Sequence, residues 1–373
     1  MRQAVAAHSV DRSRCTSTGP FISTNVISSQ AHTRQSSKLE RGQSPLRFGI
    51  LGAAPIAVNA LIRPARALPE VLIAAVAARD PARAQVFARQ HGIARVHESY
   101  AALLADPTID AVYIPLPNSL HAPWGIRALQ TGKHVLCEKP LAANAHDAAL
   151  MAQAAASANR VLAEAFHYRY HPLAARLQAI IGSGELGHIW HIETEFSVPL
   201  LKPHSIQFRY DLAGGAGMDV GCYAMNLLRM LANAEPRVLR ASARLLRPQV
   251  DRLMGAELAF AAGCCGRMTC ALLSSRLLRA SASVYGSDGE LYVNFPFLPH
   301  YFHHIAITAR GRTRREQIRG TTTYSYQLRA FVQAVRTGVP LITSPTDAVA
   351  NMRAIDACYM AAGLALRQST PPS

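Results

Sequence analysis

The sequence predicts two architectures in succession: an α/β domain built on a parallel sheet, followed by an α+β domain built on a large, mostly antiparallel open sheet. Apolar strand segments alternate with helical segments between residues 47 and 164, which is the pattern of βα units. Between residues 237 and 294, short segments of alternating apolar and polar residues follow one another without helices, which indicates an antiparallel sheet. Two helical segments, at 324–337 and 345–366, close the chain.

The α/β part begins with a strand at 47–51, a tight turn and a helix at 55–68, and a second strand follows at 72–78. The first helix has free N–H groups and a partial positive charge at its N-terminus, which suit a pyrophosphate. The glycine fingerprint of such sites is incomplete, so the turn alone fits an ordinary βα connection equally well. The residues that would line the phosphates are Gly52, Ala53, Ala54, Ile56 and Ala57.

The end of the second strand indicates which nucleotide would bind. A cofactor without a 2′-phosphate is usually held by a carboxylate there, whereas this chain has Arg79 and, one helical turn later, Arg83. Guanidinium groups pair bidentately with phosphate, so we expect NADP, with NAD as the alternative. Asp80 is the competing acid, but its position before Pro81 is that of a helix N-cap.

Two later strands lead into further candidate residues. The strand at 110–115 precedes Pro117, Asn118 and His121, and the strand at 134–137 precedes Glu138 and Lys139. Open α/β sheets bind ligands at the carboxyl ends of their strands, so Lys139 is a candidate ligand contact rather than an ordinary loop lysine. Asn118 could instead cap the next helix. His121 would either contact a phosphate or ribose or cap that helix.

The second half of the chain supplies polar groups at the expected junction of the domains. His167 and Arg169 follow a strand at 161–164, and pockets commonly form at domain junctions. Asp219 and Tyr223 are four residues apart and share one face of a helix, and the glycines at 214, 215 and 217 would let this loop approach a ligand closely. A tyrosine pKa lies near 10, so Lys139 would have to lower it for Tyr223 to act as a base. Alternatively, Tyr223 only packs, with its hydroxyl bound to Asp219.

Seven segments, in the same order, resemble the Gfo/Idh/MocA oxidoreductase family over roughly residues 47–368: GILGAAPIA, AARDPARA, VYIPLPNSLH, GKHVLCEKPLA, EAFHYRYHP, GGAGMDVGCYAMNLLRML and SYQLRAFVQAV. The chain looks most similar to the branch with NADP-dependent dihydrodiol dehydrogenase and D-xylose dehydrogenase, because that branch has tyrosine where inositol dehydrogenases have histidine.

The resemblance implies that Lys139 contacts the substrate hydroxyl and the nicotinamide ribose and that Tyr223 transfers the proton. Asp219 would lie beside them in the substrate pocket. The Pro117 to His121 turn would border the nicotinamide, and Glu138 would anchor the Lys139 loop. Many members have methionine at the position of His167, so the family's substrate preference transfers less well. The expected substrate contacts are His167, Arg169, Asp219 and Tyr223.

These observations divide the chain into four parts. We expect an N-terminal extension at 1–45, a Rossmann domain at 46–166, a substrate and oligomerisation domain at 167–344, and at 345–373 a helix that returns to the Rossmann domain before a tail. The extension has no apolar periodicity and lacks the apolar core of a secretory signal, so we expect a disordered tail or a mis-assigned start. One face of the large sheet would remain free, which predicts a homodimer or larger homo-oligomer.

Composition argues against several other partners. The chain of 373 residues has no apolar run long enough for a membrane span. Its net charge of +16 would suit nucleic acid, but no nucleic-acid-binding motif accompanies the arginines at 310–319. The seven cysteines lack metal-ligand spacing. We therefore expect no membrane, nucleic-acid or metal partner, reduced thiols and a cytoplasmic location.

Two functions remain. The first is hydride transfer between NADP and a secondary alcohol of a sugar, polyol or cyclic diol. The second is a non-catalytic NAD(P)-binding sensor of the same fold. The presence of Lys139, Asp219 and Tyr223 together favours the enzyme, because a sensor needs no base opposite a hydride acceptor.

Overall fold

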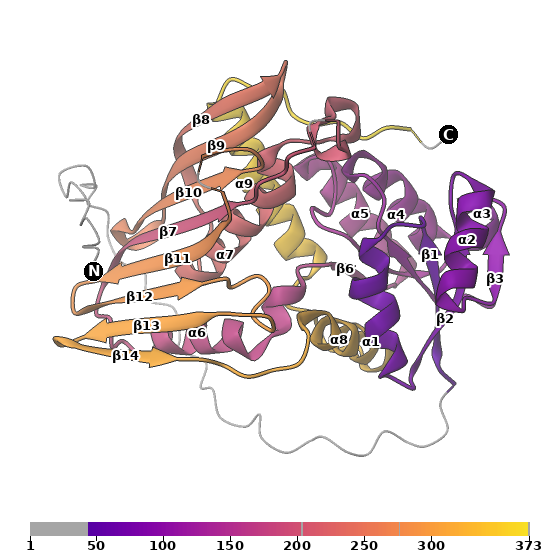
Figure 1. Cartoon of the computed structure of the whole chain (residues 1–373), viewed down its shortest axis with the longest axis horizontal. Coiled ribbons are helices and arrows are strands. Elements are labelled where there is room, and N and C mark those ends of the chain that lie inside the picture. The colour runs from indigo at the N-terminus through magenta and orange to yellow at the C-terminus, as the bar shows by residue number, and fades with distance from the viewer. Residues whose placement is uncertain (1–43, 203, 276, 372–373) are drawn as a thin grey trace.

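The computed structural model describes residues 44–371, apart from residues 203 and 276. The expectations for residues 1–45 therefore lie almost wholly outside the described residues. Figure 1 shows two sheets side by side, with the smaller sheet on the right, the larger sheet on the left, and helices packed between and around them.

The smaller sheet has six strands, all parallel, in the order β3-β2-β1-β4-β5-β6. Strand β1 pairs with β2 on one side and with β4 on the other, so the order in which strands are added reverses between β1 and β4. Such a switch point is where open α/β sheets bind their ligands. The strands are β1 (Leu46–Leu51), β2 (Val71–Ala77), β3 (Arg95–His97), β4 (Ala111–Ile114), β5 (His134–Cys137) and β6 (Leu162–Glu164).

Both faces of this sheet are buried. Phe48 and Ile50 belong to one apolar cluster, whereas their neighbour Leu51 belongs to another, as expected for side chains that alternate across a strand. The helices of this part are η2 (Val58–Ile62) and α1 (Arg63–Arg66), which continue each other, α2 (Pro81–His91), α3 (Tyr100–Ala105), η3 (Asn118–Leu120), α4 (His121–Gln130) and α5 (Ala145–Ala158).

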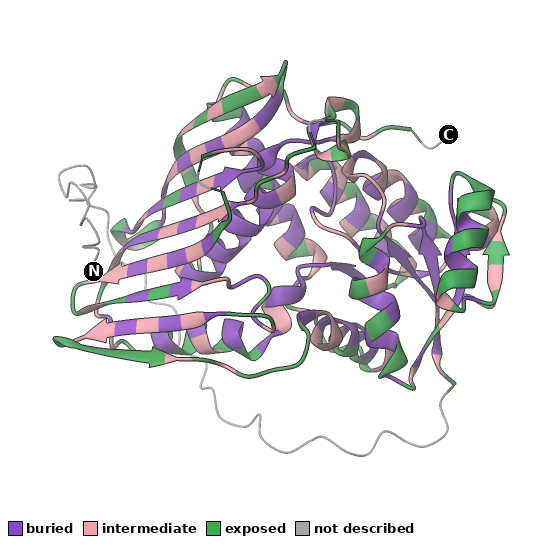
Figure 2. Cartoon of the chain, viewed as in Figure 1, coloured by how far each residue is buried: buried purple, intermediate pink, exposed green. Residues whose placement is uncertain are grey.

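The larger sheet has eight strands in the order β14-β13-β12-β11-β7-β10-β9-β8. Strands β7 and β10 are parallel, and every other neighbouring pair is antiparallel. Buried and more exposed residues alternate along these strands (Figure 2), so one face is covered. The strands are β7 (Ile189–Ser197), β8 (Arg237–Arg247), β9 (Val250–Ala259), β10 (Cys265–Ala271), β11 (Arg279–Gly286), β12 (Gly289–Asn294), β13 (His304–Ala309) and β14 (Arg312–Glu316).

The second half of the chain has four longer helices: α6 (Pro172–Gly182), α7 (Cys222–Ala232), α8 (Thr323–Thr337) and α9 (Pro345–Ala361). Helix α7 lies on the covered face, where the Thr194 hydroxyl of β7 donates to the Ala224 carbonyl at 3.0 Å. Helix α8 packs on the smaller sheet, with the Phe331 and Phe48 rings 5.7 Å apart. Short helices fill the connections: η4 (His167–Tyr170), η5 (Ile206–Phe208), η6 (Tyr210–Leu212), η7 (Gly217–Gly221) and η8 (Ala261–Gly263).

Helix α9 joins the two halves of the molecule. Its Asp356 accepts a hydrogen bond from the N–H of Ala145 at the start of α5, and its Asn351 donates to the Cys222 carbonyl at the start of α7. The helix therefore touches both the nucleotide-binding half and the helix that carries Tyr223.

The predicted fold class is confirmed, with three differences in detail. Strands β3, β13 and β14 were not predicted, and Arg312, Arg314 and Arg315 of the arginine-rich segment lie on β14. The last helix ends at Ala361 rather than at residue 366. The division of the chain into domains remains a prediction.

Candidate active site

The turn after β1 has the geometry expected of a dinucleotide site. Gly52 has φ +120°, and a Cβ added there would lie 3.1 Å from the Leu116 side chain, so a glycine is required. The following residues Ala54, Pro55 and Ile56 are at least partly exposed at the carboxyl edge of β1. They lead directly into the helical segment of η2 and α1. An exposed helix start at the switch point of the sheet fits a pyrophosphate.

Two exposed arginines lie next to this turn. Arg83 donates a hydrogen bond to the Ala53 carbonyl at 3.0 Å, and Arg79 lies two residues after the end of β2. Asp80 accepts from the N–H groups of Ala82 and Arg83, so it caps α2, as the sequence predicted. The Asp80 carboxylate is thus occupied by backbone N–H groups, and the charged side chains next to the ribose position at the end of β2 are the two arginines.

The turn after β4 is tied to the rest of the site. Pro117 is partly buried, and the Asn118 side chain donates to the Ala213 carbonyl at 3.0 Å, which links this turn to the glycine segment ahead of Asp219. His121 is fully buried, with its ring nitrogens 2.8 Å from the Pro140 and Leu116 carbonyl oxygens. His121 therefore neither caps a helix nor faces the crevice, in contrast to both sequence-based alternatives, and it supports the Lys139 loop from behind.

Lys139, Asp219 and Tyr223 converge, as the sequence predicted. The Lys139 Nζ donates to the Asp219 carbonyl at 2.8 Å and lies 3.3 Å from its Oδ1. The same Nζ lies 4.9 Å from the centre of the Tyr223 ring. Asp219 is on η7 and Tyr223 opens the first turn of α7, so the four-residue spacing does place both toward Lys139. Tyr223 does not bond to Asp219; its hydroxyl lies 3.1 Å from the Nε2 of His167.

The charges around this cluster favour a permanently charged lysine and a neutral tyrosine. Burial would lower the pKa of Lys139, but Asp219, Cys222 and Glu138 raise it above its ordinary value. The pKa of Tyr223 is raised well above 10, first by burial and then by Tyr324, Glu138, Cys222 and Asp219. Lys139 is not among the main influences on the Tyr223 pKa, and its ammonium contacts Asp219 and the Tyr223 ring, so the expected net lowering of this pKa is not seen.

Glu138 anchors the Lys139 loop. Its Oε1 accepts from the Tyr113 hydroxyl at 2.6 Å, and its Oε2 lies 3.4 Å from the Lys139 N–H. Burial raises the pKa of Glu138. These contacts agree with an anchoring role inside the protein.

Arg169 points to a different partner from the other predicted substrate contacts. Its Nη1 lies 3.3 Å from the Asn226 Oδ1 and 3.5 Å from the Asp347 Oδ2. The structure thus brings together Lys139, Asp219, Tyr223 and His167, while Arg169 joins α7 to α9.

The glycine segment ahead of Asp219 packs against a buried ion pair that sequence analysis missed. A Cβ on Gly215 would lie 2.1 Å from the Asp251 Oδ1, and Gly215 has φ +135°. The Asp251 Oδ2 accepts from the Gly217 N–H at 2.7 Å, and Asp251 pairs with Arg367 at 2.9 Å with both side chains fully buried. These glycines therefore make room for Asp251 and its partners, and not for a ligand as predicted. A lone acid in a strand gives no sequence signal for this role.

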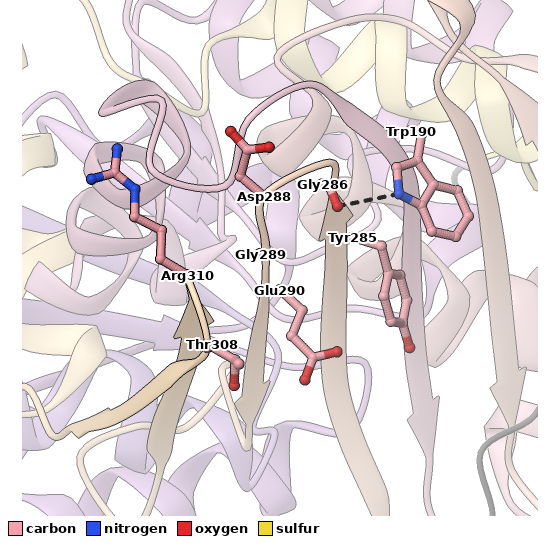
Figure 3. Close-up of a pocket in the computed structure, with 9 residues that line it drawn as sticks. Trp190, Tyr285, Gly286, Asp288, Gly289, Glu290, Thr308 and Arg310 are labelled. Carbon is pink, nitrogen blue, oxygen red and sulfur yellow. Dashed lines mark hydrogen bonds between the residues drawn. The ribbon is translucent and has the colours of Figure 1, made fainter.

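A separate pocket of about 270 Å³ lies at the turns of the larger sheet (Figure 3). None of its lining residues belongs to the predicted site. Trp190 closes one side and donates to the Gly286 carbonyl at 3.3 Å. The pocket is lined by Trp190, Tyr285, Gly286, Asp288, Gly289, Glu290, Thr308, Arg310 and Gly311.

Other expectations have mixed outcomes. Within residues 44–371, no group of three or more His, Cys, Asp or Glu side chains could hold a metal ion. No helix in the described part of the chain is long and apolar enough to cross a membrane. Among the described residues, Cys137, Cys222, Cys264, Cys270 and Cys358 are free thiols.

The sheet order, the switch-point turn and the lysine, aspartate and tyrosine cluster define an NAD-binding oxidoreductase with a Rossmann fold. Residues 46–166 match the model of an oxidoreductase family with an NAD-binding Rossmann fold, and residues 174–292 match the GFO/IDH/MocA C-terminal domain. The chain belongs to the GFO/IDH/MocA oxidoreductase family.

Relatives of known activity span almost the whole chain. D-xylose 1-dehydrogenase (NADP(+)) 2 of Haloferax volcanii is 38% identical over 320 residues, which are 85% of this chain and 97% of that protein. Trans-1,2-dihydrobenzene-1,2-diol dehydrogenase of Xenopus tropicalis is 31% identical over 74% of this chain and 82% of its own length. The crystal structure of KijD10, a 3-ketoreductase from Actinomadura kijaniata in complex with NADP and TDP-benzene, superposes with a TM-score of 0.80 at 28% identity and covers 85% of this chain and 98% of that chain.

Proposed function

We propose that this oxidoreductase transfers a hydride between NADP and a secondary alcohol of a sugar, a polyol or a cyclic diol. The observation that carries the proposal is the convergence of Lys139, Asp219 and Tyr223 beside the switch point of a parallel sheet. The named relatives are enzymes that act on such compounds, and no observation favours the sensor.

The residues at the crevice fit the cofactor. The turn from Gly52 to Ala57 would hold the pyrophosphate, and Arg79 and Arg83 would pair with the 2′-phosphate. The nicotinamide supplies the chemistry of accepting or giving a hydride. The protein supplies the proton: Tyr223 takes it from the substrate hydroxyl during oxidation and returns it during reduction.

Lys139 and Asp219 act as a unit in this scheme. Asp219 holds the Lys139 ammonium through both its carbonyl and its carboxylate, so the ammonium has a fixed position next to the Tyr223 ring. From there it can donate to the substrate oxygen and stabilise negative charge that develops on it. The sequence also predicted substrate contacts for His167 and Arg169, but the His167 ring lies against the Tyr223 hydroxyl and Arg169 faces Asn226 and Asp347, so neither has that role in this scheme.

Turnover by variants tests the proposal. The purified protein, with NADP or NADPH and a panel of aldoses, polyols, cyclic diols and the corresponding ketones, is followed at the nicotinamide absorbance band. Tyr223→Phe should lower turnover by roughly a hundred- to ten-thousandfold while NADP binding is retained. Lys139→Met should lower turnover as well, and the double variant should be far from additive because the two residues act together.

Tyr292→Phe is the matched control. Tyr292 is 40% exposed on the large sheet and is not part of the proposed site, so this variant should have the turnover of the wild type. Near wild-type turnover by Tyr223→Phe on a genuine substrate would show that the proton-transferring group is elsewhere. If no substrate reacts while NADP still binds, the sensor becomes the better account.

We also propose a homodimer formed through the open face of the larger sheet. On β11, Ala282 and Val284 are buried toward the helices, while Ser281 and Ser283 on the other face remain partly exposed (Figure 2). The residues beside them in register on this face are polar, charged and aromatic, including Glu193 and Tyr292, and a wide face of this kind suits a flat contact with a second copy. Light scattering after size exclusion tests this, and a monomer at micromolar concentration contradicts it. A cytoplasmic location also remains a prediction, to be tested by cell fractionation.

A further inference from the structure

His167 is packed between two tyrosines at the centre of the site. Its ring lies 4.1 Å from the ring of Tyr324, and its Nε2 lies 3.1 Å from the hydroxyl oxygen of Tyr223. His167 is 3% exposed, and its Nδ1 is buried without a hydrogen-bond partner among the described residues. All of the polar contact that this ring makes is therefore directed to the proposed proton-transferring residue.

The ring is neutral in this environment. Burial, followed by the nearby His300 and Lys139, lowers the pKa of His167 to about 3. A neutral imidazole carries one N–H, and the other nitrogen accepts. If the proton were on Nδ1, this buried N–H would have no acceptor, and the Tyr223 hydroxyl would have to donate its hydrogen bond to the unprotonated Nε2 of His167. If the proton is on Nε2, the N–H has a partner and the Tyr223 hydrogen stays available for the substrate.

We propose that His167 keeps its single ring proton on Nε2 and that this N–H donates a hydrogen bond to the Tyr223 oxygen. The hydrogen bond positions the Tyr223 hydroxyl and stabilises the phenolate that forms when Tyr223 loses its proton. The proposal rests on the proposed function only in assigning the proton transfer to Tyr223. His167 acts through Tyr223 and is thus a positioning residue rather than a contact that recognises the substrate.

The atoms balance without a proton leaving His167. In reduction, the Tyr223 O–H bond breaks and its proton joins the substrate oxygen, while the hydride from NADPH joins the substrate carbon. The resulting Tyr223 phenolate accepts a hydrogen bond from the His167 Nε2–H. Oxidation with NADP reverses each step. The donor matters because four groups near Tyr223 disfavour the phenolate: Tyr324, Glu138, Cys222 and Asp219 all raise its pKa. The Lys139 ammonium, 4.9 Å from the centre of the ring, makes no hydrogen bond to the hydroxyl among the described residues.

The charged and titratable groups around His167 come from four elements. Tyr223 faces it from α7 and Tyr324 from α8, while His300, from the loop between β12 and β13, and Lys139, from the loop after β5, act at longer range. None of these groups offers the Nε2 an acceptor that competes with Tyr223. The assignment of the proton thus depends on this single contact.

The tautomer can be measured without turnover. Nitrogen-15 and carbon-13 shifts of labelled histidine distinguish the Nε2–H from the Nδ1–H form, and the signal that disappears in His167→Met identifies the residue among the 15 histidines. We expect an Nε2–H ring that does not titrate between pH 5 and 9. An Nδ1–H ring, or one that becomes protonated in this range, overturns the proposal whether or not the protein turns over an alcohol.

The pH profile of alcohol oxidation tests the consequence. His167→Met removes the donor at similar size and should raise the apparent pKa of turnover by about one to two units, as expected for a lost hydrogen bond to a charged group. His167→Gln offers an amide N–H as a donor, so its apparent pKa of turnover should lie close to the wild-type value. His303→Met is the control at a second buried histidine, whose ring bonds to Pro299 and Ile318, and it should leave the profile in place. A uniform loss of turnover in His167→Met without a shift indicates a purely structural role and refutes the proposal.

Discussion

Replacing Arg367 by methionine should be among the most destabilising single changes in this protein. Arg367 is 1% exposed, and its guanidinium donates to the Asp251 Oδ1 at 2.9 Å and to the Gly214 carbonyl at 2.8 Å. Its centre lies 4.2 Å from the Tyr359 ring. Methionine fills much of the same volume but leaves the Asp251 carboxylate buried with only the Gly217 N–H and the Tyr359 hydroxyl as donors.

Removing one partner of a buried ion pair typically costs about 3 to 5 kcal/mol, because the remaining charge is left uncompensated. Arg314→Met is the matched control. Arg314 makes two contacts of 2.7 Å with Glu185 and one of 3.1 Å with Glu316, yet its side chain is 43% exposed. Exposed pairs contribute about 0 to 1 kcal/mol. The two variants thus lose similar numbers of charge-assisted bonds and differ in burial.

Urea unfolding followed by circular dichroism measures both free energies of unfolding. We expect a much lower midpoint for Arg367→Met with an unchanged slope, and a loss that shrinks at acid pH, where Asp251 can take up a proton. Turnover should also fall, since Gly217 is bound to Asp251 and lies two residues before Asp219. If Arg367→Met loses no more stability than Arg314→Met, the reasoning from burial is wrong.

Two further changes test the nucleotide edge and the large sheet. Arg83→Ala should weaken the binding of NADP by roughly tenfold or more and leave the binding of NAD nearly unchanged. Calorimetric titration with both cofactors measures the two affinities, and equal losses would reject the assignment of Arg83 to the 2′-phosphate. Arg176 and Arg314 lower the pKa of Glu316 to about 2. The contribution of the Glu316 carboxylate to the stability of the fold is therefore present above pH 4.5 and is lost as the pH falls toward 2. Glu316→Gln should therefore show a weaker loss of stability between pH 5 and 2 than the wild type.

The elements that the sequence predicted well are those whose pattern is local. Strand-end positions made Lys139 a candidate ligand contact, because the carboxyl edge of a parallel sheet gathers its loops. Its place beside Asp219, 80 residues away along the chain, was implied by the family resemblance. The direction of the Lys139 ammonium was not predictable, since it depends on the backbone carbonyl of Asp219. The same limit applies to the role of the glycines at 214–217, which is set by Asp251 and Arg367, 34 or more residues away along the chain.

Glu164 offers a test of the interior next to Lys139. It is 1% exposed at the end of β6, its Oε1 accepts from the Leu141 N–H at 2.8 Å, and its Oε2 has no partner among the described residues. Burial, and next the charge of Asp347, raises its pKa from 4.5 to about 8, although Arg229 and Lys139 oppose the shift. Glu164 should therefore be protonated at neutral pH.

A raised pKa in the folded state means that the stabilisation is complete below pH 4.5 and is lost as the pH rises through about 8. A pKa difference of about 3.5 between the folded and unfolded states corresponds to roughly 5 kcal/mol. Glu164→Gln keeps the acceptor for Leu141 and cannot ionise, so it should match the wild type near pH 4 and be the more stable protein at pH 9. Unfolding at both values measures the difference. Equal pH dependence of the two proteins would mean that Glu164 is already ionised at neutral pH, with its second oxygen solvated, and that the Lys139 loop rests on a charged support.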